Sequence, residues 1–591
     1  MGKLSCLRAC GTLFLLTCGA AMSDGAVFPV TSVADSGPGT LRQAILDSNA
    51  RPATSGPNVI EFAFSGTPPY VIKPQGQFLP PLKGPVVVRM KEVAAPAAAP
   101  VDADAGRGGG RGRGGPVPLH APVSDLAPTV VLDGSGLVKP RVLSDCPGAT
   151  FNYNWQNQKW EASDVRGDGP NVRGYYGPGL AVQDSHDVEI TGLEIRDFCA
   201  GVATVRSSNV YIHDVKIVDN QGAAGVIFTG DDGHTGRTEL SFNNRLVNSL
   251  LLDNGDGFEF TRGTHDSLLQ GNYIALTQPL PEDGNAVEFA SAGDNNAVIG
   301  NTFTKYTDVA VTIGGNRHTI RDNKFLANVN GGLRASGADL LIEGNTFTDN
   351  GGTAMSVGGP GTRVLDNLIT GSGGQGISIN NATVTLSRNS IFNNAHLGIA
   401  LAAPGAGRGV APGGRGGPRP AGPPPAALVA AVAAAGGTLP TPEPAAGPGR
   451  GDPGAGGRGR GGAPAGAAAP GVEVIPGYPV LAGTSTWTAN GIVLKGALAA
   501  KPGERYSIEL FVSRAEDRHS GDEHGWGEGE KYLGTAYATA DAAGKAAFTL
   551  SLDLTDPFGN GQSTGFFTAT ATDSAGSTSV FSRALRLTKS M

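Results

Sequence analysis

Apolar residues recur at a fixed spacing between positions 298 and 401. Five segments begin with Asn followed two positions later by Phe or Ile, and successive asparagines are 22 residues apart. They are Asn301, Asn323, Asn345, Asn367 and Asn389. An aliphatic residue lies three positions before each asparagine, and an apolar residue lies ten positions after it. Within each unit apolar and polar positions alternate, as in strands, and do not follow the period of a helix.

A repeat of this length is typical of a solenoid, and the Gly and Asn residues between the strands predict turns. A unit of 22 residues has room for three short strands and three turns, so the pattern predicts a parallel β-helix. Each strand then pairs with its equivalent one coil away, about 4.8 Å distant, and equivalent residues form columns. We expect the asparagine column to pass side-chain hydrogen bonds from coil to coil.

The segment ahead of these coils predicts a cap. Thr40 and Gln43 have the spacing of a capping box, and Leu41, Ala44 and Ile45 lie on one face, which predicts a short amphipathic helix. A solenoid needs a cover over its open apolar end. A helix before the first coil would supply that cover.

Four pieces of the sequence resemble one known family. They are the run SGPGTLRQAI, a strand that ends in FSG, the run LPPLKGPVVV and the run VVLDGSG. Together they resemble the N-terminal part of bacterial secreted right-handed β-helix proteins, which are akin to the pectate lyase superfamily. The resemblance implies an all-β chain whose main domain is a right-handed parallel β-helix. It implies no single activity, because this family contains lyases, hydrolases, epimerases and adhesins.

The chain divides into four parts. Residues 1–26 have the basic start, short apolar stretch and small-residue cleavage site of a secretory signal peptide. Residues 27–401 form the expected β-helix, interrupted at 92–125 by a low-complexity insert that is expected to be disordered. Residues 402–471 are a linker rich in Gly, Pro, Ala and Arg. Residues 472–591 contain alternating strands separated by turns, which predicts a β-sandwich of Ig-like type.

Composition narrows the class of protein. The 591 residues include 91 Gly and 41 Pro, aromatic residues make up 6%, and the formal net charge is −7. This balance argues against a basic nucleic-acid binder and fits a turn-rich β protein. After the leader no stretch resembles a membrane helix, so we expect a secreted or surface-bound monomer without a transmembrane span. A lipoprotein anchored through Cys18 is an alternative, although Thr17 is an unusual residue before a lipidated cysteine.

Two cysteines follow the leader, Cys146 and Cys199. In an oxidising compartment they can form one disulfide bond. Two separate buried thiols are an equally good interpretation. Cysteines and histidines do not cluster with metal-ligand spacing anywhere in the sequence.

The 22-residue spacing loosens at about 229–300, where extra residues lengthen the coils. Long loops on a rigid scaffold are where function usually lies. Alignment of equivalent strands places Glu259 and Glu288 in one outward column on adjacent coils, with Arg334 two coils further on and Asp256 close by. Like charges directly opposite one another are unfavourable unless they turn to water or share a cation or proton.

Two chemistries fit these four candidate catalytic residues. Pectate-lyase-like enzymes hold Ca²⁺ with carboxylates on the outer face, and a basic Arg or Lys removes a proton from the sugar. Asp253 and Asp283 are the candidate metal ligands in that scheme. In a glycoside hydrolase a close pair of carboxylates acts as acid and as nucleophile or base. The simplest alternative is that acidic side chains on a solvent-facing strand only keep the surface hydrated.

Aromatic residues are concentrated in an excursion between positions 141 and 179. Trp155, Trp160, Tyr175 and Tyr176 are the candidate binding residues, because aromatic rings can stack on sugar faces. We favour the alternative that they form a small core that pins this segment to the solenoid.

The sequence therefore predicts a secreted protein that binds, and in the enzymatic case processes, an extracellular polysaccharide or cell-surface glycan. The first alternative is a Ca²⁺-dependent lyase or a glycoside hydrolase that acts on a uronate-containing polymer. The second is a cell-surface adhesin or structural protein. Ca²⁺ is the one cofactor that the residues suggest, and no nucleic-acid partner is expected.

Overall fold

The structure is a computed structural model, and it describes residues 25–53, 56–91, 123–137, 152–154, 156, 159–161, 177–222, 224–230, 240–278, 284–380, 383–401, 478–516 and 527–590. The predicted linker at 402–471 lies outside these residues, as do nearly all of the leader at 1–26 and most of the insert at 92–125. The insert ends in a short 3-10 helix, Val123–Asp125. A second one, Gly134–Gly136, follows β5.

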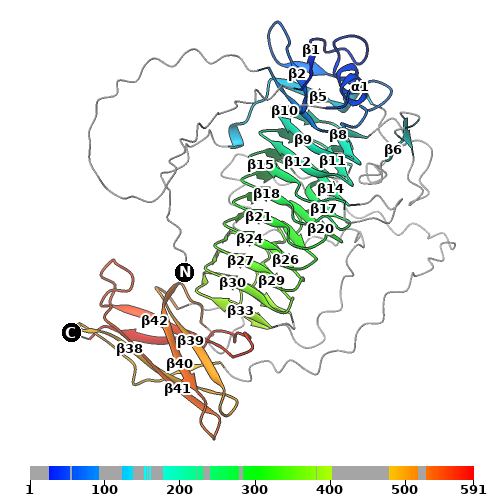
Figure 1. The fold of residues 1–591 in the computed structure, drawn as a ribbon. Coiled ribbons are helices and arrows are strands. Elements are labelled where there is room, and N and C mark those ends of the chain that lie inside the picture. The colour runs from blue at the N-terminus through cyan, green and yellow to red at the C-terminus, as the bar shows by residue number, and fades with distance from the viewer. Residues whose placement is uncertain are drawn as a thin grey trace, which may run out of the picture.

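Three parallel sheets form a right-handed parallel β-helix, as predicted (Figure 1). In stacking order the first sheet contains β1 (Val27–Val30), β2 (Asn58–Phe62), β4 (Val86–Met90), β9 (His186–Thr191), β12 (Ser208–His213), β15 (Arg245–Val247), β18 (Leu268–Gln270), β21 (Ala297–Ile299), β24 (Thr319–Arg321), β27 (Leu341–Glu343), β30 (Thr362–Leu365) and β33 (Val384–Ser387). The second contains β3 (Tyr70–Ile72), β5 (Val130–Asp133), β10 (Leu193–Arg196), β13 (Lys216–Val218), β16 (Leu250–Leu252), β19 (Tyr273–Ala275), β22 (Thr302–Thr304), β25 (Lys324–Leu326), β28 (Thr346–Thr348), β31 (Leu368–Thr370) and β34 (Ser390–Phe392). The third, called the site sheet below, contains β8 (Pro178–Gln183), β11 (Ala200–Val205), β14 (Ala224–Thr229), β17 (Asp256–Thr261), β20 (Val287–Ala290), β23 (Val311–Ile313), β26 (Gly331–Ala335), β29 (Thr353–Val357), β32 (Ile377–Ile379) and β35 (Ile399–Leu401).

Side-chain amides hold the coils in register. Asn345 donates from Nδ2 to Oδ1 of Asn367 at 2.9 Å, and its own Oδ1 accepts from the backbone N–H of Asn323 at 2.9 Å. The same amide contact joins the other repeated asparagines, and Asn272 extends the column toward the N-terminus. The predicted amide ladder is therefore confirmed.

A second amide column lies five positions further along the chain and was not predicted. Asn328 donates from Nδ2 to Oδ1 of Asn350 at 2.9 Å, and the backbone N–H of Tyr306 donates to Oδ1 of Asn328. Tyr306 therefore occupies the position in this column that asparagine has in the next two coils.

Apolar side chains fill the tube between the sheets. Phe303, Phe325 and Phe347 are fully buried and lie in one column, and the ring centroids of Phe325 and Phe347 are 4.3 Å apart. Burying an aromatic side chain of this size stabilises a fold by about 2–3 kcal/mol. These columns recur with the repeat, so the core is one continuous stack.

The predicted helix caps the N-terminal end. In α1 (Leu41–Ala50) the Oγ1 atom of Thr40 accepts a hydrogen bond from the backbone N–H of Gln43 at 3.2 Å. Leu41 and Ile45 on the inner face of the helix are buried in the same core as the first strands. In the described part of the chain, no helix has the length and apolar character needed to cross a membrane.

Residues 478–590 form a β-sandwich of two antiparallel four-stranded sheets. One contains β36 (Val480–Leu481), β37 (Thr486–Thr488), β38 (Gly491–Ala499) and β41 (Lys545–Leu552). The other contains β39 (Arg505–Ser513), β40 (Lys531–Thr539), β42 (Thr564–Thr572) and β43 (Leu585–Thr588). The two sheets share a core that includes Trp487, Ile508 and Phe567. A separate antiparallel pair, β6 (Asn152–Asn154) and β7 (Lys159–Glu161), lies outside both domains.

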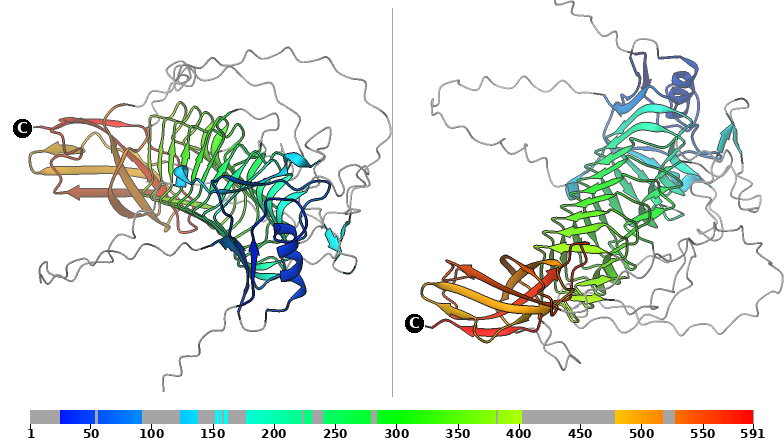
Figure 2. Two further views of the ribbon diagram at one scale, coloured as in Figure 1. Left: turned by 90° about the horizontal axis from the view of Figure 1, so that it is seen from above. Right: turned by 60° about the horizontal axis from the view of Figure 1, so that its bottom comes forward.

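The sandwich closes the C-terminal end of the β-helix (Figures 1 and 2). Phe511 and Phe581 of the sandwich belong to the apolar core of the β-helix. The backbones of Ile391 and Gly529 exchange two hydrogen bonds of 2.8 Å. The sandwich therefore caps the solenoid, a role that the sequence did not indicate.

Candidate functional site

The predicted charged column lies on the outer face of the site sheet. β17 pairs in parallel with β20, and this register places Glu259 directly opposite Glu288, as predicted. Thr312 follows on β23 and Arg334 on β26. The register of the column was therefore predicted correctly from the repeat.

A glycine brings a third carboxylate to this face. A Cβ atom on Gly257 would point into the tube, where it would lie 2.5 Å from the carbonyl oxygen of Ala286. Phe258, the next residue, is also fully buried in the tube. Because these two residues both face inward, Asp256 and Glu259 on either side of them face outward.

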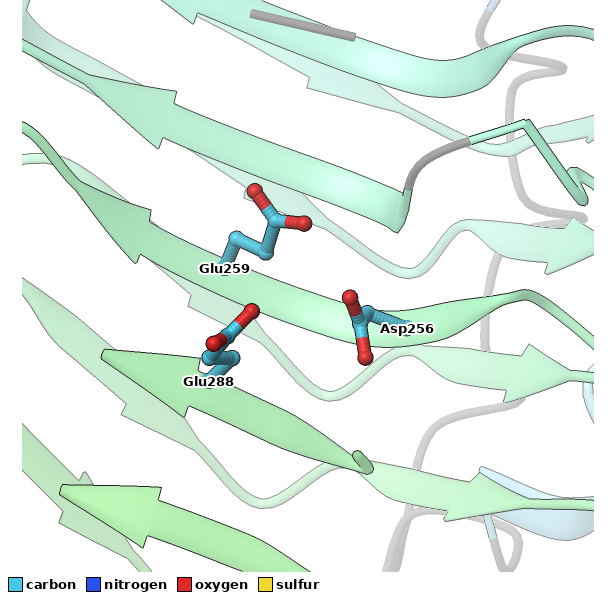
Figure 3. Close-up of side chains that lie close together, drawn as sticks. All are labelled: Asp256, Glu259 and Glu288. Atoms are coloured by element: carbon cyan, nitrogen blue, oxygen red, sulfur yellow. The ribbon is translucent and has the colours of Figure 1, made fainter. Parts of the chain in front are cut away.

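Asp256, Glu259 and Glu288 converge on one point and are called the carboxylate trio below (Figure 3). One oxygen of each carboxylate lies within 4.8 Å of one oxygen of the other two, and all three side chains are partly buried. The backbone N–H of Asn285 donates to Oδ1 of Asp256 at 2.5 Å and fixes that carboxylate.

The surroundings of Glu259 disfavour its charge. Burial raises the pKa of the Glu259 carboxyl well above its ordinary value, and the charges of Asp256 and Glu288 raise it further. On the adjacent strand β14, Ala224 lies opposite Asp256 and Ile227 lies opposite Glu259, and both are fully buried. The trio can relieve its repulsion by keeping a proton or by binding a cation.

The donor set fits a hard divalent cation. Carboxylate oxygens lie about 2.0–2.6 Å from bound Mg²⁺ or Ca²⁺, so two ligands on opposite sides of the ion are about 4–5 Å apart. The oxygens of the carboxylate trio are within 4.8 Å of one another, in agreement with this requirement. Oxygen donors of this type suit Mg²⁺, Ca²⁺ or Mn²⁺ and not softer metals.

Of the other predicted site residues, the structure describes the side chains of Asp253 and Arg334, and neither joins the trio. Both oxygens of Asp253 accept hydrogen bonds from Thr277, at 2.6 Å from its backbone N–H and 2.5 Å from its hydroxyl. Arg334 is exposed and makes no ion pair with any described residue. Asp283, Trp155, Tyr175 and Tyr176 lie outside the described residues, and so does the side chain of Trp160, whose backbone belongs to β7.

Sequence reasoning missed two residues beside the trio. The hydroxyl of Tyr306 is fully buried behind β17, 2.9 Å from the position of a Cβ on Gly257, and burial raises its pKa well above the ordinary value. Thr261 is 4% exposed and lies two residues beyond Glu259, so strand alternation puts both on one face. The sequence marks Tyr306 as a tyrosine at a position that asparagine has in the next two coils. No sequence feature marks Thr261.

Cys199 is disulfide-bonded. Cys146, which the sequence offered as its partner, lies outside the described residues.

The fold and the site define a parallel β-helix protein that carries a carboxylate cluster on the outer face of one sheet. Residues 161–363, which include the carboxylate trio, match the sequence model of a family described as periplasmic copper-binding protein (NosD). The chain is also similar to the 3-dehydroshikimate dehydratase of Acinetobacter baylyi (strain ATCC 33305 / BD413 / ADP1), with 33% identity over 275 residues. That match covers 46% of this chain and 47% of the relative, so the chain spans about half the length of the curated relative it matches.

Solved structures resemble the fold at low sequence identity. The alginate lyase from Paenibacillus sp. str. FPU-7 has a TM-score of 0.36 and 13% identity, over 64% of this chain and 98% of the lyase. A mutant of the periplasmic alginate epimerase AlgG has a TM-score of 0.30 and 9% identity, over 58% of this chain and 77% of the epimerase.

Proposed function

We propose that the protein is a carbon–oxygen lyase that acts on a hydroxylated carboxylic acid. The observation that carries the proposal is the carboxylate trio, in which three oxygens converge within 4.8 Å and one of the acids has a raised pKa. The ionised form of a carboxyl with a raised pKa is a stronger base than an ordinary carboxylate. The similarity to a dehydratase, an enzyme that removes water, supports the same class of reaction.

Each member of the trio has a role in this proposal. Asp256 and Glu288 supply oxygen ligands to a divalent cation, which stabilises negative charge on a substrate carbonyl or carboxylate when it is bound. Glu259 takes the proton from the adjacent carbon as the carbon–oxygen bond one position further breaks and a double bond forms. Glu259 then returns that proton to the departing oxygen, so that water or an alcohol leaves.

The environment of Glu259 suits this exchange. The carboxyl lies beside the fully buried Ile227, which keeps water away from it on that side. In such surroundings the ionised form is less favoured than it is in water, so the carboxylate binds a proton more strongly. One group can therefore act first as base and then as acid.

The experiment is an assay for a new conjugated double bond by ultraviolet absorbance. The full chain is incubated with 3-dehydroshikimate and with uronate oligomers, in the presence of Mg²⁺, Mn²⁺, Ca²⁺ or a chelator. We expect turnover that needs a cation, and a loss of at least about 100-fold in Glu259→Gln, the size of a lost acid–base catalyst. Glu343→Gln, which removes a partly buried carboxylate from the first sheet, is the matched control and should be fully active.

Cation binding by the same variants separates the roles. Asp256→Asn should weaken binding of Mn²⁺ at least about tenfold, because it removes a charged oxygen ligand. Glu259→Gln should change that affinity much less. The proposal fails if cation-loaded protein produces no double bond from any of these acids.

A second candidate is non-catalytic binding of an extracellular polysaccharide. It is favoured by the accessible outer face beyond Glu288, where Thr312 is partly exposed and Arg334 is exposed. A location outside the cytoplasm fits both candidates, since Cys199 is disulfide-bonded and the matching family is described as periplasmic. Binding of uronate polymers without any change in absorbance or in reducing ends would favour this candidate over the lyase.

A further inference from the structure

The outer face of the site sheet is covered on one side of the trio and open on the other. The column that contains Glu259 and Glu288 begins with three outward residues that are at most 3% exposed, namely Ala181, Ala203 and Ile227. Beyond Glu288 it continues with residues that solvent reaches, namely Thr312, Arg334, Ser356 and Ser378. A ligand at the trio can therefore extend along the column in one direction only.

The face is also closed along the strands. The neighbouring outward column includes Val205, Thr229 and Thr261, which are at most 4% exposed. A chain of sugar units bound at Glu259 could therefore not continue toward the C-terminal end of β17, because these residues are covered. The trio thus lies in a corner of the accessible surface and not in the middle of an open groove.

A buried hydroxyl in this corner points to a ligand. The Oγ1 atom of Thr261 has no hydrogen-bond partner among the described residues, although the side chain is 4% exposed. Buried hydroxyls in folded proteins are nearly always hydrogen-bonded, because an unmade bond is costly. Its place beside Glu259, on the same face, suits a polar group of a bound molecule.

A positive charge lies at the open end of the same column. Arg334 is two strands beyond Glu288, which corresponds to about 10 Å between backbones. An extended arginine covers much of that distance, and its guanidinium matches the geometry of a carboxylate. The column therefore offers oxygen-binding groups at the closed end and a carboxylate-binding group at the open end.

We infer that the site takes a small hydroxylated carboxylic acid and not an internal residue of a polymer. The oxygen atoms around the reacting carbon of the bound acid lie at the trio and at Thr261. The carboxylate of the bound acid, several ångströms away, lies at Arg334. Arg334 and Thr261 are then specificity-determining residues. The inference rests on the proposed function, which supplies the use of the trio.

Equilibrium binding tests this inference without turnover. Shikimate, quinate and galacturonate are titrated calorimetrically into the full chain with Mn²⁺ present, each beside its methyl ester. We expect at least one acid to bind about tenfold or more tightly than its ester, the effect of one charge-assisted contact. Arg334→Gln should abolish that preference. Arg363→Gln, which removes an exposed arginine from the first sheet, should retain it.

Two further arms complete the test. Thr261→Val should weaken the acid and its ester by the same factor, since it removes a contact at the other end of the ligand. Long polygalacturonate should bind more weakly than the best small acid. Equal binding of acid and ester, an acid preference that survives Arg334→Gln, or tighter binding of the polymer would each overturn the inference. Cation-dependent elimination from a methyl ester at the rate of the acid would overturn it too, while leaving the lyase intact.

Discussion

Asn394 donates a hydrogen bond of 2.9 Å from its side-chain amide to Oε1 of Glu528, so an amide column of the β-helix ends on a residue of the sandwich. Both side chains are buried, at 4% and 2% exposure. Glu528 occupies the place that an asparagine of one more coil would have. The sandwich therefore completes the last coil chemically as well as covering its apolar end.

Replacing Glu528 by Ala should destabilise the whole β-helix. The change leaves the buried amide of Asn394 without this acceptor, which costs about 1–3 kcal/mol of the free energy of unfolding. Glu528→Gln keeps an oxygen at the same place and should cost less. Urea denaturation followed by circular dichroism measures both. Equal stability of Glu528→Ala and the unaltered chain would show that the sandwich is only attached to the β-helix.

The asparagine ladder inside the β-helix should contribute as much to stability as the contact of Asn394 with Glu528 does at its end. Asn345 donates to the carbonyl oxygen of Ile320 at 2.9 Å and accepts from the backbone N–H of Asn323 at 2.9 Å. Asn345→Ala removes both hydrogen bonds and takes this acceptor from the buried backbone N–H of Asn323, so we expect a loss of about 1–3 kcal/mol in the free energy of unfolding. Thr346→Ala, one residue away on the outer face, is the matched control and should change stability by less than about 1 kcal/mol. Similar losses in the two variants would contradict the ladder's role.

The raised pKa of Glu259 predicts how stability depends on pH in the absence of a cation. A carboxyl whose pKa is higher in the folded than in the unfolded state binds its proton more tightly when folded. Its stabilising effect is complete below the ordinary value of 4.5 and is lost as pH rises through the raised folded value. The chelated protein should therefore melt at a lower temperature as pH rises through that window.

Glu259→Gln should remove this part of the pH dependence. Thermal melts with chelator, recorded across the pH range for both proteins, show whether the difference between them grows with pH. Added Mn²⁺ should restore the melting temperature of the unaltered protein at high pH, because the cation offsets the repulsion within the trio. Parallel melting curves for the two proteins would mean that Glu259 ionises as freely as a surface carboxylate.

The repeat in the sequence was enough to predict most of the β-helix. A strict 22-residue period fixes which residues share a column, so the amide ladder from Asn301 to Asn389 follows from counting. The pairing of Glu259 with Glu288 lies where this spacing loosens, and it follows from aligning the equivalent strands of adjacent coils. The capping helix was also predicted, since Thr40 and Gln43 carry a local signal for it. These features depend on neighbours one coil away or a few residues away.

The remaining features depend on contacts that a period does not encode. Asp256 joins the trio because Gly257 and Phe258 both face the tube, which breaks the simple alternation of a strand. Docking of Glu528 on Asn394 joins residues 134 positions apart through surfaces without repeats. Asp253 is a residue type that can bind a metal, but its oxygens accept hydrogen bonds from Thr277 on the adjacent coil. Local geometry and packing decide which of these side chains meet, and a sequence period carries no information about either.

His318 should make the protein sensitive to acid. Its Nδ1 accepts a hydrogen bond of 3.0 Å from the backbone N–H of Asn296, and its Nε2–H donates to the carbonyl oxygen of Gly314 at 3.0 Å. The ring is therefore neutral, and burial lowers its pKa from 6.5 to about 4. A histidine whose folded pKa is lowered contributes stability that is present above the unfolded value and is lost as pH falls through the folded one. The difference between these two pKa values corresponds to at most about 3 kcal/mol of the free energy of unfolding.

His318→Asn tests this account, since asparagine occupies the equivalent position in the preceding coil as Asn296. Its side-chain oxygen can accept from the backbone N–H of Asn296 at any pH. The free energy of unfolding should match that of the unaltered chain near pH 7 and exceed it near pH 4. His396→Asn, at an exposed histidine, should leave the acid loss unchanged. If the unaltered chain and His318→Asn lose stability equally between these pH values, the acid sensitivity has its origin elsewhere, in the carboxylates that also titrate in this range.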